Sequence, residues 1–312
     1  MIKIKHMEVV FLNKLKKTII PLLTACSVGM LGGCGNKDNS GNDKIKIAYL
    51  PITHALTVCE LAEESDDIEL VKYGSWTELM DALNTGRVDG ASVLIELAMK
   101  SREQGVKLSA VALGHRDGNV IITSDKIQDI TDLKGKTFAI PHRQSSHNIL
   151  LNEALSGAGM TIDDINITEL SPTEMPSALA GGQIDGYCVA EPFGAKAVSM
   201  GIGKVLYSSE DLWQDSLCCG LVLTDKFIEE NKDKTEKLIS EYKQAGKNLD
   251  TEKSKEVAKK YLNQDDDVLD ISLQWISYDN LDITEESYDS LTEKVIKYNL
   301  SENPPSYEDF VK

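Results

Sequence analysis

The chain has 312 residues, 41% of them hydrophobic and 27% charged, which is the composition of a soluble globular protein and excludes disordered or collagen-like chains. Lysine and arginine total 33 against 50 aspartates and glutamates, so the formal net charge is −17. A surface of that sign repels polyanions, and we expect no nucleic-acid partner.

The first 33 residues have the layout of an export signal. Three lysines between residues 14 and 17 precede an apolar run, 18–31, that is short for a membrane span of about 20 residues. The run ends in Leu31-Gly32-Gly33-Cys34, which resembles the bacterial lipobox. The resemblance implies cleavage before Cys34 and a lipid on its sulfur, which anchors the chain to the outer face of the cytoplasmic membrane. An ordinary signal peptide, or a buried helix with a chance cysteine, is the alternative.

Residues 34–43 are expected to form a flexible tether, because Gly35 to Asp43 include no apolar residue and cannot pack. Loss of residues 1–33 removes five lysines and one glutamate, which leaves the exported part at a net charge of −21. The folded part is therefore more acidic than the whole chain.

Six cysteines occur, of which one lies in the signal and one at the anchor. The other four are Cys59, Cys188, Cys218 and Cys219. The sequence contains no CxxC pair and no run of cysteine with histidine, so we predict no metal site and no redox motif. Buried free thiols are expected, with one disulfide as the alternative outside the cytoplasm.

From residue 44 onward, short apolar runs alternate with amphipathic stretches. A helix is predicted over 55–63, and Ser75 caps a second helix with Glu78 three residues later. The predicted strands are 44–50, 68–73, 88–94, 107–113 and 120–123. Such alternation predicts β-α-β units with a mostly parallel sheet, the arrangement of an α/β fold.

A second α/β unit follows from residue 130. Its predicted strands and helices are 137–140, 145–158, 165–170, 173–180, 186–190 and 204–207. Residues 83–90 and 179–186 repeat one phrase: a helix end, a glycine suited to a left-handed cap, then an apolar residue and Asp-Gly entering a strand. The chain therefore has two similar lobes, followed by charged amphipathic helices over 226–263 and 285–298.

Seven short motifs in this order resemble the solute-binding proteins of ABC importers for nitrate, taurine, alkanesulfonates and pyrimidine precursors. They are Pro51-Ile52-Thr53-His54, residues 86–90, residues 132–136, Ser146-His147, residues 181–186, Ala190-Glu191-Pro192 and residues 224–227. The resemblance covers essentially the whole exported part. It implies an α/β architecture, the type II periplasmic-binding fold, in which two lobes with mostly parallel sheets are joined by two crossing strands.

The resemblance also implies how the chain divides. Lobe one would comprise 44–120 and 225–312, and lobe two 121–224, with crossing strands near 119–124 and 219–224. A protein of this family is a monomer without a cofactor. It holds a small solute in the cleft between its lobes and delivers it to ABC permease and ATPase subunits.

In open α/β sheets a ligand binds beyond the carboxyl ends of the strands, where helix N-termini offer free amides. The turn 141–147 places two hydroxyls, two imidazoles and a guanidinium at such a position, and all of them can donate to a strongly polar group. Helix capping by Ser145 or Ser146 alone is the alternative. The candidate ligand-binding residues are Thr53, His54, Trp76, Glu96, Asn119, Arg143, Ser145, Ser146, His147, Tyr187 and Glu191.

The donors of this turn predict a small organic ligand with a sulfonate, carboxylate or similar acceptor, and a more neutral part that lies against Trp76. The acidic surface opposes free anions only at long range, where salt screens it. A thiamin precursor, thiamin or another nitrogen heterocycle is the alternative, and it would pair with Glu191 or Glu96.

Catalysis is the competing class of function. Fungal hydroxymethylpyrimidine phosphate synthases look similar to this fold, with a histidine where His54 stands and a Cys-rich run where Cys218-Cys219 stand. That run is longer in them, and here Gly220 and Leu221 follow. The sequence contains no triad spacing, P-loop or HExxH motif. We therefore expect a binding protein and not an enzyme, with a solute sensor that uses the same cleft as a further alternative.

Overall fold

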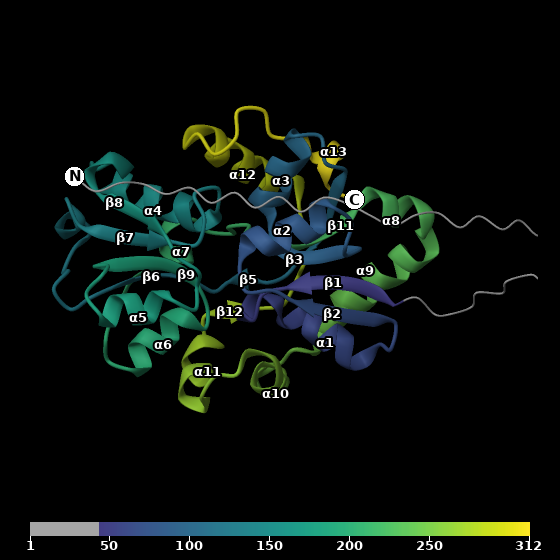
Figure 1. Cartoon of the computed structure of the whole chain (residues 1–312), viewed down its shortest axis with the longest axis horizontal. Helices are drawn as coiled ribbons and strands as arrows, with labels where there is room; N and C mark the ends of the chain where they lie inside the picture. The colour runs from purple at the N-terminus through teal and green to yellow at the C-terminus, as the bar shows by residue number, and fades with distance from the viewer. Residues whose placement is uncertain (1–43) are drawn as a thin grey trace, which may run out of the picture. The chain divides into compact units, whose positions relative to one another are not determined.

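The computed structural model describes residues 44–312. The predicted signal peptide (1–33), the predicted lipid site Cys34 and the predicted tether (34–43) lie outside these residues. Within the described part, no helix has both the length and the apolar character that crossing a membrane requires. This part contains two five-stranded sheets and a two-stranded one (Figure 1).

The first sheet, in the first lobe, has the strand order β2-β1-β3-β11-β4. The strands are β1 (Ile45–Tyr49), β2 (Ile68–Lys72), β3 (Gly90–Leu94), β4 (Leu108–Leu113) and β11 (Cys219–Thr224). β1 runs parallel to β2 and β3, whereas β11 runs antiparallel to both β3 and β4. Every residue of β3 and β4 is buried, which explains why these strands are continuous apolar runs in the sequence.

The second sheet, in the second lobe, has the order β10-β6-β9-β7-β8. The strands are β6 (Asn119–Thr123), β7 (Thr137–Ile140), β8 (Asn166–Glu169), β9 (Gly186–Ala190) and β10 (Lys204–Ser208). β7 runs parallel to β8 and β9, and β6 is antiparallel to β9 and β10. Each sheet therefore has four strands that run in one direction and one, second from the edge, that runs against them.

The repeated sequence phrase performs the same task in both lobes. The Asp89 carboxylate accepts a hydrogen bond from the Lys46 amide at 2.8 Å, and the Asp185 carboxylate accepts one from the Thr137 amide at 3.1 Å. Three residues before each aspartate, a glycine ends the preceding helix turn with φ of +67° or +66°. Each aspartate thus ties the start of its own strand to the start of the strand beside it, and the predicted similarity of the lobes is confirmed.

The division between the lobes differs from the expected one at β11. The segment 219–224 was expected to be a crossing strand of the second lobe, but β11 pairs on both sides within the first sheet. β6, the other expected crossing, pairs on both sides within the second sheet. The chain instead passes between the sheets through residues 114–118, which include β5 (Arg116–Asp117), and through residues 209–218. β5 pairs with β12 (Ile276–Ser277).

The helices cover the faces of the sheets and link the two lobes. Those of the first lobe are α1 (Leu56–Glu64), α2 (Trp76–Asn84) and α3 (Ile95–Glu103), and those of the second are α4 (Ser146–Gly157), α5 (Met175–Ala180) and α6 (Phe193–Ser199). Shorter turns are η1 (Thr53–Ala55), η2 (Ile130–Leu133), η3 (Ile162–Asp164) and α7 (Ser209–Leu212).

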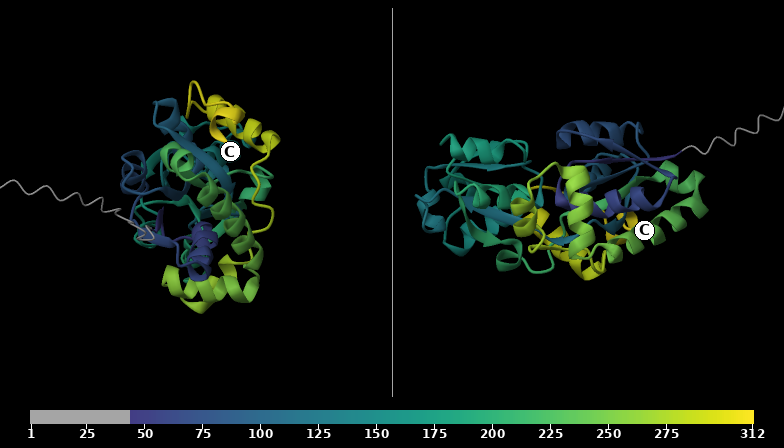
Figure 2. Two further views of the ribbon diagram at one scale, coloured as in Figure 1. Left: turned by 90° about the vertical axis from the view of Figure 1, so that its right-hand side faces the viewer. Right: turned by 90° about the horizontal axis from the view of Figure 1, so that it is seen from below.

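The C-terminal third of the chain, green to yellow in Figure 2, is mostly helical. It comprises α8 (Asp225–Glu230), α9 (Lys232–Asn248), α10 (Thr251–Leu262), α11 (Asp266–Ser272), α12 (Glu285–Lys297) and α13 (Tyr307–Phe310). α9 and α10 pack on α1 of the first lobe, whereas α11 packs on α6 of the second. In addition, Lys294 and Lys297 of α12 form ion pairs with Glu153 of α4. The C-terminal helices therefore contact both lobes.

Candidate functional site

The strand ends of the two sheets meet at a group of buried polar side chains. η1 follows β1, α3 follows β3, α4 follows the turn after β7, and Glu191 follows β9. Ten of the eleven predicted binding residues are at most 3% exposed, and the exception is Arg143. This is the arrangement that the strand-end rule predicts for a ligand site in an open α/β sheet.

Two of the predicted residues, Thr53 and Glu191, form hydrogen bonds between the lobes. The amide and the hydroxyl of Thr53 both donate to the carbonyl oxygen of Glu191, each at 2.9 Å. Thr53 lies after a strand of the first sheet and Glu191 after a strand of the second. The Thr53 carbonyl in turn accepts from the hydroxyl of Tyr278 at 2.9 Å. This contact therefore joins the two lobes beside Gly118, whose carbonyl accepts from the Glu191 amide at 3.0 Å.

The turn before α4 caps the helix and aims one imidazole inward. The Ser145 hydroxyl donates to the His142 carbonyl at 2.6 Å and accepts from the Asn148 amide at 3.4 Å, as the capping alternative predicts. Neither ring nitrogen of buried His147 has a hydrogen-bond partner. Burial lowers the pKa of His147 to about 4, so the neutral ring offers one donor and one acceptor at neutral pH.

Three more polar side chains lie buried around the same space. The indole Nε1 of Trp76 and the amide Nδ2 of Asn119 have no hydrogen-bond partner. Burial raises the pKa of Glu96 well above its ordinary value, the neighbouring Cys218 adds to the rise, and Ser146 opposes it. The protonated form of Glu96 is therefore favoured, and a protonated carboxyl can donate a hydrogen bond. Buried polar groups ordinarily have partners, so such a group of donors indicates a place for a ligand.

A cavity of about 290 Å³ lies beside this group. Its walls come from α2 and α3 of the first lobe and from His142 and Gln144 of the second. Trp76 belongs both to the cavity wall and to the buried group. The cavity therefore lies at the junction of the two lobes and shares Trp76 with the buried group.

Three of the predicted residues have other partners. Arg143 is exposed, forms an ion pair with Glu169 at 3.3 Å and donates to the carbonyl of Ile167. Its long side chain follows the surface of the second lobe and does not enter the buried group. The Tyr187 hydroxyl donates to the carbonyl of Phe193 at 2.8 Å.

Glu191 is occupied within its own lobe. Its carboxylate accepts from the Ala195 amide at 3.0 Å, and burial raises its pKa to about 8. A Cβ at Gly194 would meet the same carboxyl group at 2.4 Å, so the glycine is required for the close approach. Glu191 therefore serves the start of α6, and Glu96 is the buried carboxyl that faces the other side chains of the site.

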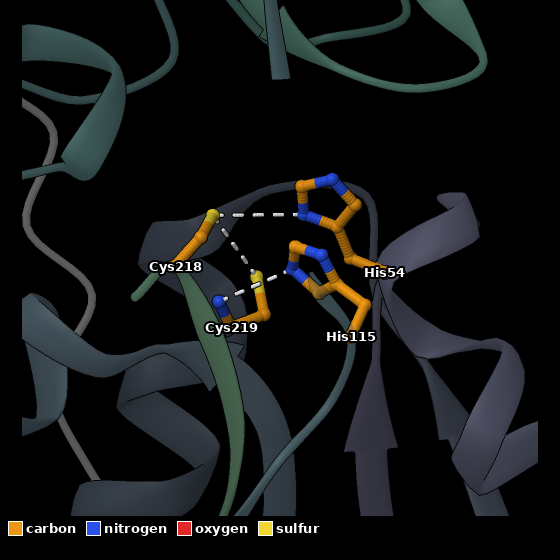
Figure 3. A group of neighbouring side chains, drawn as sticks. All are labelled: His54, His115, Cys218 and Cys219. Atoms are coloured by element: carbon orange, nitrogen blue, oxygen red, sulfur yellow. Dashed lines mark hydrogen bonds between the residues drawn. The ribbon is translucent and has the colours of Figure 1, made fainter. Parts of the chain in front are cut away.

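The structure overturns the expectation that cysteines and histidines do not cluster. His54, His115, Cys218 and Cys219 are all buried, and one ligand atom from each lies within 4.8 Å of the others (Figure 3). The four described cysteines are all free. Sequence reasoning missed His115 as a site residue. The available signal was its position after a strand end, in a sheet whose pairing with β11 the sequence did not reveal.

The charges in this cluster influence one another. Burial alone raises the pKa of the Cys218 thiol, but the hydrogen bond with Cys219 and the imidazoles of His54 and His115 bring it well below its ordinary value. Burial and the neighbouring Cys218 raise the pKa of Cys219. Burial and His54 lower the pKa of His115 to about 4. Of the two thiols, Cys218 is therefore the one that ionises more readily, and His115 is neutral at neutral pH.

Known proteins resemble this chain over most of its length. The profile of the NMT1-like family matches residues 38–263. A ligand-binding component of an ABC-type import system from Staphylococcus aureus, solved with zinc bound, is 40% identical, with a TM-score of 0.82. The match covers 86% of this chain and 96% of that one. The fold expected from the resemblance is thereby confirmed.

Two curated relatives match different fractions of their own length. The nitrate import ATP-binding protein NrtC of Synechocystis is 28% identical over 204 residues, which is 56% of this chain and 30% of the relative. The putative aliphatic sulfonates-binding protein of Bacillus subtilis is 25% identical over 249 residues, which is 74% of this chain and 73% of the relative. The chain thus spans less than a third of the first protein and most of the second.

Proposed function

Because the chain belongs to the NMT1-like family, we propose that it is the solute-binding component of a bacterial ABC importer. In this role it captures a small solute between its lobes outside the cytoplasmic membrane and delivers it, as a monomer, to permease and ATPase subunits. The import-system relative from Staphylococcus aureus and the sulfonates-binding relative from Bacillus subtilis support the role. A cavity lined by residues of both lobes is consistent with capture of a solute between them.

The chemistry of the buried group favours an organic solute with a strong acceptor, such as a sulfonate or carboxylate. The observation that carries this proposal is that the Trp76 indole, the Asn119 amide and the His147 ring each hold a buried N–H donor without a hydrogen-bond partner. Ser146 and protonated Glu96 add hydroxyl donors. An acceptor group would satisfy several of these donors at once, and each such bond to a charged acceptor contributes roughly 1.5–3 kcal/mol.

A nitrogen heterocycle, such as thiamin or a thiamin precursor, is the alternative solute. A cationic ring would pair with Glu96 in its ionised form and stack on Trp76. Glu191 is less suited to this task, because its carboxylate already accepts a hydrogen bond within α6. The two solute classes therefore differ at Glu96: an acceptor solute takes a hydrogen bond from the protonated carboxyl, whereas a cationic ring pairs with the ionised carboxylate.

Metal capture is a second candidate function. The Staphylococcus aureus relative was solved with zinc bound, and this chain gathers two histidines and two cysteines. In this version of the receptor role, the ion itself is the cargo.

We also propose that the exported chain is anchored by lipid on Cys34 and performs no catalysis. The lipobox-like residues 31–34 support the anchor. The enzyme alternative draws on the same His54 and Cys218 that lie together here. Binding without catalysis predicts that a bound solute is recovered chemically unchanged after long incubation with the protein. A sensor would bind in the same way but would not need the transport subunits for its effect.

The experiment that tests the receptor role is a thermal-shift screen of the full chain purified in detergent. The panel comprises sulfonates, nitrate, bicarbonate, aminopyrimidines, thiamin, riboflavin and divalent metal ions. A solute at 100 times its Kd stabilises the folded state by about 2.7 kcal/mol, which raises Tm measurably. If no compound of this panel or of a wider metabolite library changes the Tm of the folded protein, the result would contradict the receptor role.

A further inference from the structure

We propose that His54, His115, Cys218 and Cys219 form a site for one thiophilic divalent cation of the Zn²⁺ class. The four side chains are buried, and one potential ligand atom from each lies within 4.8 Å of the other three. Two thiols and two imidazoles form one of the donor sets that proteins use for zinc. The site rests on the metal-capture version of the proposed function and shares His54 with the predicted solute-binding residues.

The measured distances fit a tetrahedral centre. A Zn²⁺ ion with sulfur ligands at about 2.3 Å and nitrogen ligands at about 2.0 Å holds two sulfurs about 3.8 Å apart and a sulfur and a nitrogen about 3.6 Å apart. Here the two Sγ atoms of Cys218 and Cys219 are 3.9 Å apart, and the Sγ of Cys218 lies 3.6 Å from Nδ1 of His54. The three atoms are therefore already spaced as ligands of a single ion.

The hydrogen bond on the far side of His54 fixes which nitrogen faces the thiols. His54 Nε2 donates to the carbonyl of Gly118 at 2.9 Å, so its Nδ1 carries the lone pair and points to Cys218. A backbone carbonyl that holds the outer N–H is the usual device for orienting a histidine ligand. Asn119 Oδ1 accepts from the Cys218 thiol at 3.7 Å in the absence of metal, and this bond is given up when the thiol loses its proton to bind an ion.

His115 is close but needs to tilt. Its ring is stacked on that of His54, with 3.5 Å between centroids and 26° between planes. Stacked rings direct their lone pairs side by side, whereas ligands of one ion direct them to a common point. His115 Nε2 accepts one long hydrogen bond from the Cys219 amide, at 3.4 Å. Because so long a bond is weak, little free energy is lost when the ring tilts and breaks it. We therefore assign Cys218, Cys219 and His54 as the primary ligands and His115 as the fourth.

The ligands gather at one edge of the first sheet, and two of them, His115 and Cys218, lie in the segments through which the chain passes between the sheets. His54 follows β1, His115 follows β4, and Cys219 begins β11, which runs antiparallel to β4. All three positions are thus at the same edge of the first sheet. Two thiolates neutralise the charge of a divalent ion in this buried position.

The test uses the full chain in detergent, reduced under anaerobic conditions and stripped with a chelator. Co²⁺ is the spectroscopic probe, because thiolate ligands give it an intense sulfur-to-metal absorption band, and competition with Zn²⁺ gives the Kd. We expect one equivalent of metal per chain with that band present. Cys218→Ser, Cys219→Ser and His54→Ala should each raise the Kd by roughly 100-fold, and His115→Ala by roughly 10-fold.

The matched controls are Cys59→Ser and Cys188→Ser, which alter buried free thiols outside the cluster. They should leave the stoichiometry, the absorption band and the Kd within about threefold of the parent chain. Circular dichroism confirms that each variant is folded. If a variant does not fold, the Co²⁺ absorption spectrum of the unmutated chain still tests the proposal. The proposal is overturned if Co²⁺ binds without the thiolate band, or if Cys59→Ser loses as much affinity as the cluster variants. It is also overturned if protein isolated without reductant contains a Cys218–Cys219 disulfide and still binds no metal after that disulfide is reduced.

Discussion

The carbonyl oxygen of Glu191 accepts two hydrogen bonds from Thr53, one from its amide and one from its hydroxyl, each 2.9 Å long. One partner belongs to each lobe, so this contact joins the lobes at the strand ends where the proposed solute site lies. We expect Thr53→Val to weaken solute binding by about 2- to 10-fold, because one neutral hydrogen bond contributes about 0.5–1.5 kcal/mol. Calorimetry with the solute returned by the thermal-shift screen measures the change.

Thr57→Val is the control for this prediction. The buried Thr57 hydroxyl donates to the carbonyl of Gly114 at 2.8 Å, and both residues belong to or directly follow elements of the first lobe. The control variant loses a similar hydrogen bond without changing the contact between lobes. An equal loss of affinity in the two variants would show that Thr53 acts on the stability of the fold and not on the contact between lobes.

The parts of the fold that were predictable depend on local sequence. The phrases ending in Asp89 and Asp185 each specify a helix end, a left-handed glycine and a strand start within eight residues, and the carboxylates make matching hydrogen bonds in the two lobes. Ser75 and Ser145 were both recognisable as caps and both accept the expected amide hydrogen bond. Local signals of this kind require no knowledge of which strands are neighbours.

The cysteine and histidine cluster depends on the opposite kind of information. Cys218 and His54 are 164 positions apart in the chain, and only the pairing of β11 with β3 and β4 brings them together. The sequence favoured β11 as a crossing strand, which concealed that pairing. Arg143 failed for a different reason: its backbone lies at the predicted turn, but its long side chain reaches Glu169 on the surface.

The buried carboxyl of Glu191 predicts a pH-dependent stability. Burial raises its pKa from 4.5 to about 8, so between those values the folded chain binds more protons than the unfolded chain. This contribution to stability is present at low pH and is lost as pH rises through about 8. Glu191→Gln removes the ionisation, so its unfolding free energy should exceed that of the parent chain increasingly from pH 5 to pH 8, by on the order of a few kcal/mol.

Urea unfolding at a series of pH values measures this difference. Glu169→Gln removes one formal charge from a largely exposed position and serves as the control. A Glu191→Gln variant that follows the parent chain at every pH would contradict the prediction. Parallel behaviour of both variants would assign the effect to net charge.

The lipid anchor predicts a change of location. Cys34→Ser should prevent lipid attachment and release the chain from the membrane fraction into the medium, because a single residue carries the attachment. Cell fractionation and labelling with a fatty acid measure both consequences. Cys26→Ser should remain membrane-bound and labelled. Retention of unlabelled Cys34→Ser protein in the membrane would argue for an uncleaved signal segment.

Glu96 separates the two classes of organic solute. For an acceptor solute, Glu96 acts as a donor, and the amide of Glu96→Gln can replace it, so affinity should stay within about 10-fold of the parent value. For a cationic heterocycle, the same variant loses the ionised partner of a buried pair, which costs about 3–5 kcal/mol. Calorimetry with one sulfonate and one aminopyrimidine from the screen decides between these outcomes.

His147 gives the most direct test of the acceptor site, because neither of its ring nitrogens has a partner in the described structure. His147→Ala removes one donor from the group that includes Trp76 and Asn119. A hydrogen bond to a charged acceptor contributes about 1.5–3 kcal/mol, so the Kd should rise by about 10- to 150-fold. Asn152→Ala is the matched control, because Asn152 lies further along α4 and its Nδ2 donates to the Asn148 carbonyl at 2.8 Å. The control should leave the Kd within about threefold. The measurement uses folded His147→Ala protein and a solute that the Glu96→Gln variant still binds. If the Kd is unchanged, the acceptor group of the solute lies away from α4, and the proposed solute class loses its main support.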